Sequence, residues 1–136
     1  MKIRNIMTTS IVTADADASL ETVQEIFSHS QFHHLLVLDN NRLYGVLSDR
    51  DLLKAISPYA GTISELPRDA ATMNKRIHQI MSRQPVTVSP QCTLQNAIKL
   101  LLKNNISCLP VLAADGRIEG IITWKDLLRT YMEDKD

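Results

Sequence analysis

The sequence has little that favours metal binding, a charged polymer as partner, or a membrane. Its 136 residues include only two cysteines, Cys92 and Cys108, whose spacing does not match that of a metal site. Lys and Arg number 15, as do Asp and Glu, so the net charge is +0 and no basic excess points to nucleic acid or an anionic membrane. No apolar run has the length of a transmembrane helix. We therefore predict two reduced cysteines, no metal site, no nucleic-acid partner and no membrane insertion.

Motifs of a catalytic centre are also absent from the sequence. It has no Walker-type phosphate loop, no nucleophile motif and no paired catalytic carboxylates. His33 and His34 are adjacent, but no nucleophile–base arrangement surrounds them, and we expect surface or strand-end residues. Basic residues precede apolar ones near the start, as in a secretion signal, but residues 8–10 (TTS) interrupt the apolar run. We predict a cytoplasmic protein that is not an enzyme and has no catalytic residues.

One seven-residue pattern occurs twice in the chain. Residues 45–51 read GVLSDRD and residues 120–126 read GIITWKD. Each copy has a glycine, two apolar residues, a hydroxyl residue, two variable residues and an aspartate. The apolar pair predicts the end of a strand, and the hydroxyl residue predicts a helix cap because an apolar pair follows the aspartate. The pattern therefore predicts a strand that turns directly into a helix.

Two interpretations of this pattern are open. Ser48 with Asp51, and Thr123 with Asp126, can be helix caps and nothing more, since such pairs are common. The same hydroxyls and aspartates can instead face a ligand, with the aspartate accepting hydrogen bonds from a sugar diol. A single copy would favour the first interpretation, so the extent of the repetition matters.

The repetition extends over most of the chain. Residues 3–7 (IRNIM) return as residues 77–81 (IHQIM), and residues 12–13 (VT) return as residues 86–87, both at an offset of 74 (77 − 3 and 86 − 12). The two motif glycines are 75 apart (120 − 45), which places one extra residue in the second hairpin turn, where insertions are tolerated. We predict a first repeat at residues 1–56, a linker at 57–76 and a second repeat at 77–136.

Each repeat is predicted to be β-α-β-β-α, which makes the fold class α+β. At only about 60 residues each, the repeats should share one core. Residues 68–81 contain good helix formers and predict a helix that leads from the linker into the second repeat. The expected strands are residues 11–14, 35–38, 43–47, 86–89, 109–112 and 118–122, and the expected helices begin near Ser19, Asp49, Thr93 and Trp124.

The order of these parts resembles a pair of CBS domains, the cystathionine-β-synthase-type regulatory repeats, in their stand-alone bacterial-type form. The matching parts are the I-x-x-I-M opening, the V-T strand, the amphipathic helix, the apolar strand and the G-h-h-[ST]-x-x-D motif. The resemblance covers nearly the whole chain except the linker. It implies two repeats packed face to face about a pseudo-twofold axis, two clefts between them, and a homodimer.

The resemblance also implies an adenosine-containing ligand in these clefts: AMP, ADP, ATP, S-adenosylmethionine or NAD, with or without Mg, and no required cofactor. The aspartates would accept hydrogen bonds from ribose, the hydroxyl residues and helix amides would face phosphate or ribose, and the V-T strands would line adenine. Arg50 and Lys125 would meet phosphate, unless they are solvated surface charges. The residues assigned to the ligand are Val12, Thr13, Ser48, Arg50, Asp51, Val86, Thr87, Pro110, Thr123, Lys125 and Asp126.

Four further expectations concern which parts of the chain act. Pro110 fits the family pattern, whereas the first repeat has Leu36 there, so we favour the Thr123/Asp126 site. Trp124 stacks on a base or, as we favour, packs against a partner chain. The linker is a connector or a partner surface, and the signal passes to a separate effector protein. The rival hypothesis is a structural dimerisation and interaction module that binds no nucleotide.

Overall fold

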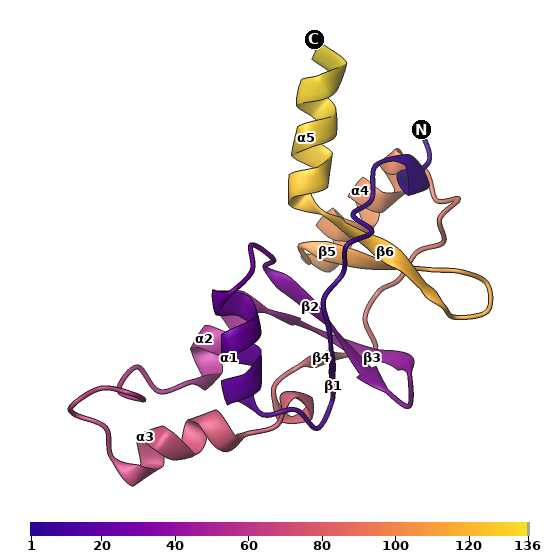
Figure 1. Cartoon of the computed structure of the whole chain (residues 1–136). Helices are drawn as coiled ribbons and strands as arrows, with labels where there is room; N and C mark the ends of the chain where they lie inside the picture. The colour runs from indigo at the N-terminus through magenta and orange to yellow at the C-terminus, as the bar shows by residue number, and fades with distance from the viewer. Residues whose placement is uncertain (136) are drawn as a thin grey trace. The chain divides into compact units, whose positions relative to one another are not determined.

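The computed structural model describes residues 1–135, which form two compact units (Figure 1). One unit is Val12–Gln84 and contains the first motif, GVLSDRD; we call it the first-motif unit. The other combines Met1–Ile11 with Pro85–Asp136 and contains the second motif; we call it the second-motif unit. The units therefore differ in composition from the sequence repeats, because the opening segment of each repeat is part of the unit that contains the other repeat's motif.

The first-motif unit is built on a four-stranded sheet with helices after its first and third strands. The strand order is β1-β2-β3-β4, with β1 parallel to β2 and the other pairs antiparallel. The strands are β1 (Thr13–Asp15), β2 (His34–Asp39), β3 (Arg42–Ser48) and β4 (Ser82–Arg83). The helices are α1 (Leu20–Ser28), α2 (Asp49–Ala55) and α3 (Pro67–Ala71), with short 3₁₀ turns η2 (Thr72–Asn74) and η3 (Ile77–Gln79).

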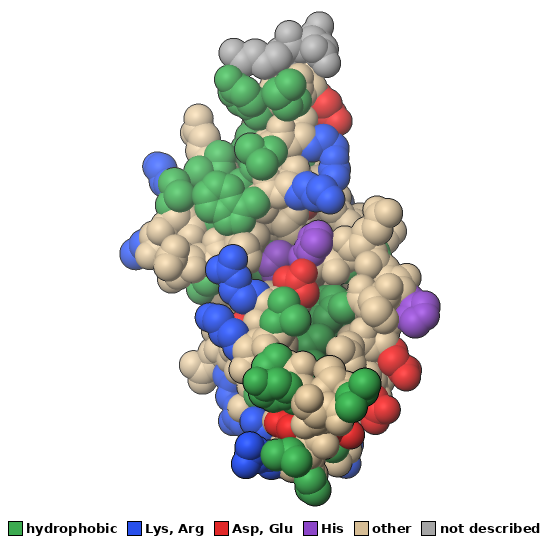
Figure 2. Space-filling view, turned by 90° about the vertical axis from the view of Figure 1, so that its left-hand side faces the viewer, with side chains coloured by type: hydrophobic (Ala, Val, Ile, Leu, Met, Phe, Trp, Pro, Cys, Tyr) green, Lys and Arg blue, Asp and Glu red, His purple; other side chains and the backbone are tan. Residues whose placement is uncertain are grey.

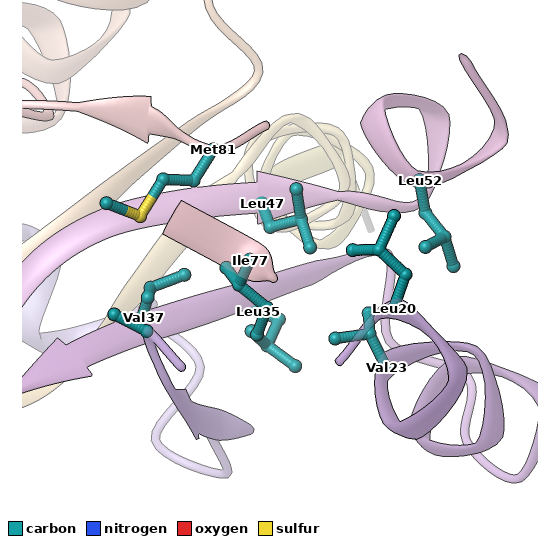
Figure 3. Packing of buried hydrophobic residues seen from close by; sticks show 9 residues of the cluster. Leu20, Val23, Leu35, Val37, Leu47, Leu52, Ile77 and Met81 are labelled. Atoms are coloured by element: carbon teal, nitrogen blue, oxygen red, sulfur yellow. The ribbon is translucent and has the colours of Figure 1, made fainter. Parts of the chain in front are cut away.

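The core of this unit forms where one face of α1 packs on one face of the sheet. Helix α1 begins because the Ser19 hydroxyl accepts a hydrogen bond from the Thr22 amide (3.3 Å). Its buried residues Leu20 and Val23 are three apart and therefore lie on one face of the helix. Figure 3 shows them beside alternate residues of β2 and residues of the opening segment. The labelled cluster is Leu20, Val23, Leu35, Val37, Leu47, Leu52, Ile77 and Met81.

The second-motif unit has its own core around a two-stranded hairpin. Strand β5 (Cys108–Leu112) pairs antiparallel with β6 (Ile118–Thr123), and helices α4 (Leu94–Asn104) and α5 (Trp124–Lys135) flank this hairpin in sequence. The opening segment carries the 3₁₀ turn η1 (Ile3–Asn5). The buried cluster is Ile3, Val88, Ala97, Leu101, Leu109, Val111 and Ile122. The predicted α+β class is confirmed.

The prediction of a helix across residues 68–81 is wrong. Helix α3 ends at Ala71, η2 ends at Asn74, and the backbone at Lys75 is extended. Hydrogen bonds to α1 and the turn before it replace helical ones there: the Leu20 amide donates to the Lys75 carbonyl (2.9 Å), and the Ile77 amide donates to the Ala18 carbonyl (3.0 Å). Tertiary bonding and the full burial of Ile77 therefore outweigh local helix propensity.

The strand predicted at residues 86–89 is reduced to a single bridge between Val88 and Val111. The equivalent strand of the other unit, β1, forms three pairs, and its ladder includes a hydrogen bond from the Leu36 amide to the Val12 carbonyl (2.9 Å). Pro110 stands in the place of Leu36 and has no amide hydrogen, so this bond to Val86 cannot form. The proline shortens the ladder at this position.

Close backbone approach explains why both motifs begin with glycine. A Cβ on Gly120 would lie 2.6 Å from the Thr8 carbonyl oxygen, and one on Gly45 would lie 2.6 Å from the Ser82 carbonyl oxygen. Thr8 and Ser82 directly follow the two I-x-x-I-M segments. Each opening segment therefore lies against the motif strand of its own unit, where only glycine leaves it room.

Membrane spans and metal clusters are absent from the described part of the chain. No helix within residues 1–135 combines the length and apolar character needed to cross a membrane. No group of three or more His, Cys, Asp or Glu side chains is arranged to hold a metal ion among those same residues.

Replacing the motif glycines should destabilise the protein. In Gly120→Ala the new methyl group would collide with the Thr8 carbonyl, and we expect a loss of about 1–3 kcal/mol in the free energy of unfolding, measured by urea denaturation. The control is Lys103→Ala, a substitution at an exposed helix position that should change the stability by less than about 0.5 kcal/mol. Equal stability of Gly120→Ala and the wild type would contradict the steric explanation.

Candidate functional site

The first motif forms a reciprocal helix cap at the start of α2. The Asp51 amide donates to the Ser48 hydroxyl (3.0 Å), and the Ser48 amide donates to Asp51 Oδ2 (3.0 Å). These bonds satisfy two amides at the start of the helix and fix the Asp51 carboxylate in position. Asp51 is half-buried, and its Oδ1 receives no hydrogen bond from any described residue. This oxygen is an acceptor held in a fixed place and open to a further donor.

The second motif repeats the cap but adds donors from outside it. The Thr123 amide donates to Asp126 Oδ2 (2.9 Å), and the Thr123 hydroxyl lies 3.2 Å from the same oxygen. Asp126 Oδ1 accepts from the Thr8 hydroxyl (2.9 Å) and from Arg129 Nη1 (3.3 Å). Only 2% of Asp126 is exposed. Both carboxylate oxygens are therefore occupied, in contrast to Asp51.

Sequence reasoning missed Thr8 and Arg129. A signal for Thr8 was present, because both I-x-x-I-M segments are followed by a hydroxyl residue, Thr8 in one and Ser82 in the other. No signal in one sequence indicated that the opening segment of one repeat would reach the motif of the other. That placement follows from the sheet of the second-motif unit, where Thr8 pairs with Ile121.

His33 and His34 lie beside the first motif. His34 opens β2 and pairs with Ser48 in the β2–β3 ladder. Burial is the main influence on His34 and lowers its pKa, although the nearby carboxylate of Asp49 acts in the opposite direction. Nδ1 of His33 lies 2.8 Å from Asp49 Oδ2, and the two side chains are 62% and 44% exposed. This arrangement agrees with strand-end residues and places imidazole groups near Ser48.

The predicted adenine-lining strands differ between the two units. In the first-motif unit the Val12 carbonyl is used by the Leu36 amide, and Thr13 belongs to β1. In the second-motif unit Pro110 offers Val86 no donor, so the Val86 carbonyl lacks the bond that its counterpart has. The half-buried Val86 and exposed Thr87 thus offer more backbone hydrogen-bonding capacity to a ligand.

The basic and aromatic residues inside the motifs are exposed. Neither Arg50 nor Lys125 forms an ion pair with another described residue, which suits a phosphate contact and also suits solvated charge. Trp124 is 45% exposed, and its indole Nε1 donates to the Ile106 carbonyl (3.3 Å). The indole is therefore held on its own unit, with one part left at the surface.

Cys108 pairs with the motif residue Thr123 in the β5–β6 ladder, whereas Cys92 and the linker belong to other parts of the chain. Neither cysteine forms a disulfide: Cys108 is buried in β5, and burial raises the pKa of the Cys92 thiol, which favours the unreactive protonated form. A hollow of about 430 Å³ opens between α1 and the linker of the first-motif unit. Its lining includes Glu21, Glu25 and Glu65 but no motif residue, so it is separate from the candidate ligand groups.

The two motif aspartates should contribute unequally to stability. Asp126→Ala leaves the half-buried Thr8 and Thr123 donors without an acceptor, and we expect a loss of about 2–3 kcal/mol in the free energy of unfolding, because a donor that loses its partner costs about 1–3 kcal/mol. Asp51→Ala removes the carboxylate of the cap on α2, and we expect a loss of about 1 kcal/mol in the free energy of unfolding. Both values come from urea denaturation, with the exposed Asp39→Ala as a control near zero. Equal losses at both positions would contradict the difference in hydrogen bonding.

Comparison with known proteins gives consistent results. The CBS domain family profile matches residues 3–58 and 77–133, and residues 59–76 between the matches fall in the predicted linker. A CBS domain-containing protein of Dictyostelium discoideum is 32% identical over 93% of this chain and 88% of its own length. MJ1225 of Methanocaldococcus jannaschii is 28% identical over 95% of this chain, but the chain spans only 46% of that protein.

Solved structures with the same fold include two with bound ligands. CBSX2 in complex with AMP is 28% identical, with a TM-score of 0.80 over 99% of this chain and 98% of that one. The CBS domain pair of MJ0100, in complex with 5'-methylthioadenosine and S-adenosyl-L-methionine, has a TM-score of 0.81 over 98% of both chains at 24% identity, which shows the fold alone. With both repeats matched by the family profile and the whole described fold shared with CBS domain pairs, this chain belongs to the CBS domain family.

Proposed function

We propose that this chain is a regulatory module that binds an adenosine-containing ligand at its motifs and signals to a separate protein. The observation that carries the proposal is the Asp51 carboxylate, which the cap fixes while one oxygen stays open to a donor. Its support from relatives is that CBSX2, 28% identical to this chain, was solved in complex with AMP, which contains adenosine.

The ribose is the part of the ligand that the motif aspartates would hold. A carboxylate oxygen accepts well from a sugar hydroxyl, and a hydrogen bond to a charged group contributes about 1.5–3 kcal/mol. Asp51 offers Oδ1 for this purpose, with the Ser48 hydroxyl beside it. Arg50, exposed and without an ion pair among described residues, would meet a phosphate. The ligand class is thus set by ribose recognition, and phosphate adds affinity, with or without Mg.

The second motif would hold the ligand with a different set of groups. Asp126 and Thr123 take the roles of Asp51 and Ser48, and Lys125 takes that of Arg50. The Val86 carbonyl, left free of a strand partner by Pro110, would accept from the adenine amino group. We propose Val12, Thr13 and Thr87 as further adenine contacts in their respective units.

Regulation requires that the ligand distinguish between two states of the protein. A ligand shifts such an equilibrium only by its differential affinity for the states. We propose that binding changes the relation between the two units, and that a partner protein reads the change. No reaction is proposed for this chain, and its compartment is proposed to be the cytoplasm.

The second candidate function is a structural interaction module without a nucleotide. The observation that favours it is the complete occupation of Asp126 by donors of its own chain, which leaves this carboxylate no acceptor position for a ligand. Under this hypothesis Asp51 is also only a cap, and the outer surfaces of the repeats carry the function.

Calorimetric titration separates the two functions. We expect AMP, ATP, NAD or S-adenosylmethionine, with and without Mg, to bind saturably to the wild type. Asp51→Asn keeps the shape and the acceptor for Ser48 but loses the charge, and we expect affinity at the first motif to fall about tenfold or more. Asp49→Asn, two residues earlier in the chain and paired with His33, is the matched control and should bind as the wild type does. No binding across the panel by the folded protein would favour the interaction module.

We propose that the protein is a homodimer and that α5 contributes to the contact. Trp124, Leu128 and Met132 are four residues apart, lie on one face of the helix, and are 45%, 63% and 61% exposed. Figure 2 shows hydrophobic side chains gathered in the upper part of the view, where this helix lies. An apolar stripe of this kind is stabilised by burial, and a second copy of the chain would provide the same surface.

A charge placed in the stripe tests this assembly. We expect Leu128→Lys to weaken self-association at least about tenfold, because a charge would be buried in an apolar contact. Sedimentation velocity at several concentrations measures the effect. The control Ile63→Lys places the same charge on a fully exposed linker residue and should leave association unchanged. A wild type that is monomeric at all concentrations would refute the homodimer.

A further inference from the structure

We infer that Thr8 and Arg129 form a latch on Asp126, so that the second motif admits a ligand hydroxyl only when these donors are displaced. The first motif has no such latch and offers Asp51 directly. The inference rests on the proposed function, since it concerns how the same class of ligand enters the second motif. It makes Thr8 and Arg129 determinants of affinity that lie outside the G-h-h-[ST]-x-x-D pattern.

The latch follows first from the number of donors around one carboxylate. An ionised carboxylate has about four acceptor positions. Asp126 receives the Thr123 amide and hydroxyl on Oδ2, and the Thr8 hydroxyl and Arg129 guanidinium on Oδ1. With 2% of the residue exposed, no acceptor position is left for a ribose hydroxyl. A ligand must therefore replace a donor that is already present.

The two Oδ1 donors are the ones that can be replaced. The Thr123 amide is part of the helix cap, so its loss would unwind the start of α5. Arg129 is 55% exposed and has a long flexible side chain, so it can turn into solvent. The Thr8 hydroxyl can leave only by rotation of its side chain.

The backbone of Thr8 is fixed by the sheet. Its amide donates to the Ile121 carbonyl (2.9 Å), and its carbonyl accepts from the Ile121 amide (2.9 Å). The absence of a side chain at Gly120 lets the segment come this close. The Thr8 hydroxyl is therefore held beside Asp126 at little further entropic cost, which makes it the stronger part of the latch.

The first motif shows that the latch is not a general consequence of the fold. Ser82 is the counterpart of Thr8 (82 − 8 = 74), and it is exposed with no hydrogen bond to Asp51. Lys54 is the counterpart of Arg129 (129 − 54 = 75), and it forms no ion pair within the described residues. The two motifs thus differ in whether this hydroxyl reaches the aspartate, and in the arginine that the first motif lacks.

Adenosine is the probe for the test, because it has the ribose but no phosphate for Arg129 to bind. Trp124 lies between Thr123 and Asp126 and is the only tryptophan, so its fluorescence reports on the second motif, while calorimetry counts all sites. We expect the wild type to bind adenosine first without a change in fluorescence, and at higher concentration with one. Thr8→Val should lower the adenosine concentration at which the second step occurs about tenfold, since the competing donor is gone and the side-chain volume is kept.

The matched variants separate the latch from general effects. Thr8→Ser keeps the hydroxyl and should behave as the wild type, and Ser82→Ala should change neither step. Arg129→Gln should lower the second step by a smaller factor, and it tests the latch independently if Thr8→Val does not fold. If the fluorescence of both Thr8→Val and Arg129→Gln changes at the same adenosine concentration as in the wild type, or at a higher one, and the first step is intact, the latch alone is overturned. No adenosine binding by the wild type or any variant would overturn the proposed function and the latch together.

Discussion

The contact on which the structure of each unit depends is the close approach of an opening segment to a motif glycine. At Gly120 the neighbour is the Thr8 carbonyl, and at Gly45 it is the Ser82 carbonyl. These contacts complete each motif strand with a segment from the other repeat, since residues 1–11 and 77–84 are exchanged between the units. They also place Thr8 beside the second motif and Ser82 beside the first. The chemistry of each motif is thus decided partly by residues far away in the sequence.

Because of this contact, the aspartates of two nearly identical motifs receive different hydrogen bonds. Both form the same reciprocal cap between a hydroxyl residue and an aspartate three residues later. A cap occupies only one carboxylate oxygen, so capping and ligand binding are compatible at Asp51. At Asp126 the second oxygen is occupied by Thr8 and Arg129. Whether the aspartate is available to a ligand therefore depends on whether its second oxygen already accepts hydrogen bonds, and the motif alone does not determine this.

Patterns repeated in the sequence were sufficient for the elements and the caps. The β-branched and aliphatic runs predicted β2, β3, β5 and β6, and the hydroxyl residues predicted the starts of α1, α2 and α4, because these signals are local. The incorrect predictions concern segments whose structure depends on hydrogen bonds between residues far apart in the sequence. The Lys75 and Ile77 backbones bond to the α1 region instead of continuing a helix, and Pro110 removes a ladder bond from the residues near Val88. The Thr8–Asp126 contact, 118 residues apart in sequence, could not be read from any local pattern.

The same proline changes what the second motif offers to a ligand. By withholding an amide it leaves the Val86 carbonyl unbonded in the ladder, while the Thr8 and Arg129 donors occupy the aspartate. The second-motif unit is then better suited than the first to hold a base but less ready to hold a ribose. A ligand that satisfied the free carbonyl would gain energy that offsets the displacement of the Asp126 donors. A bare ribose phosphate would gain nothing at that carbonyl, so selectivity for the complete nucleoside would be higher at the second motif than at the first.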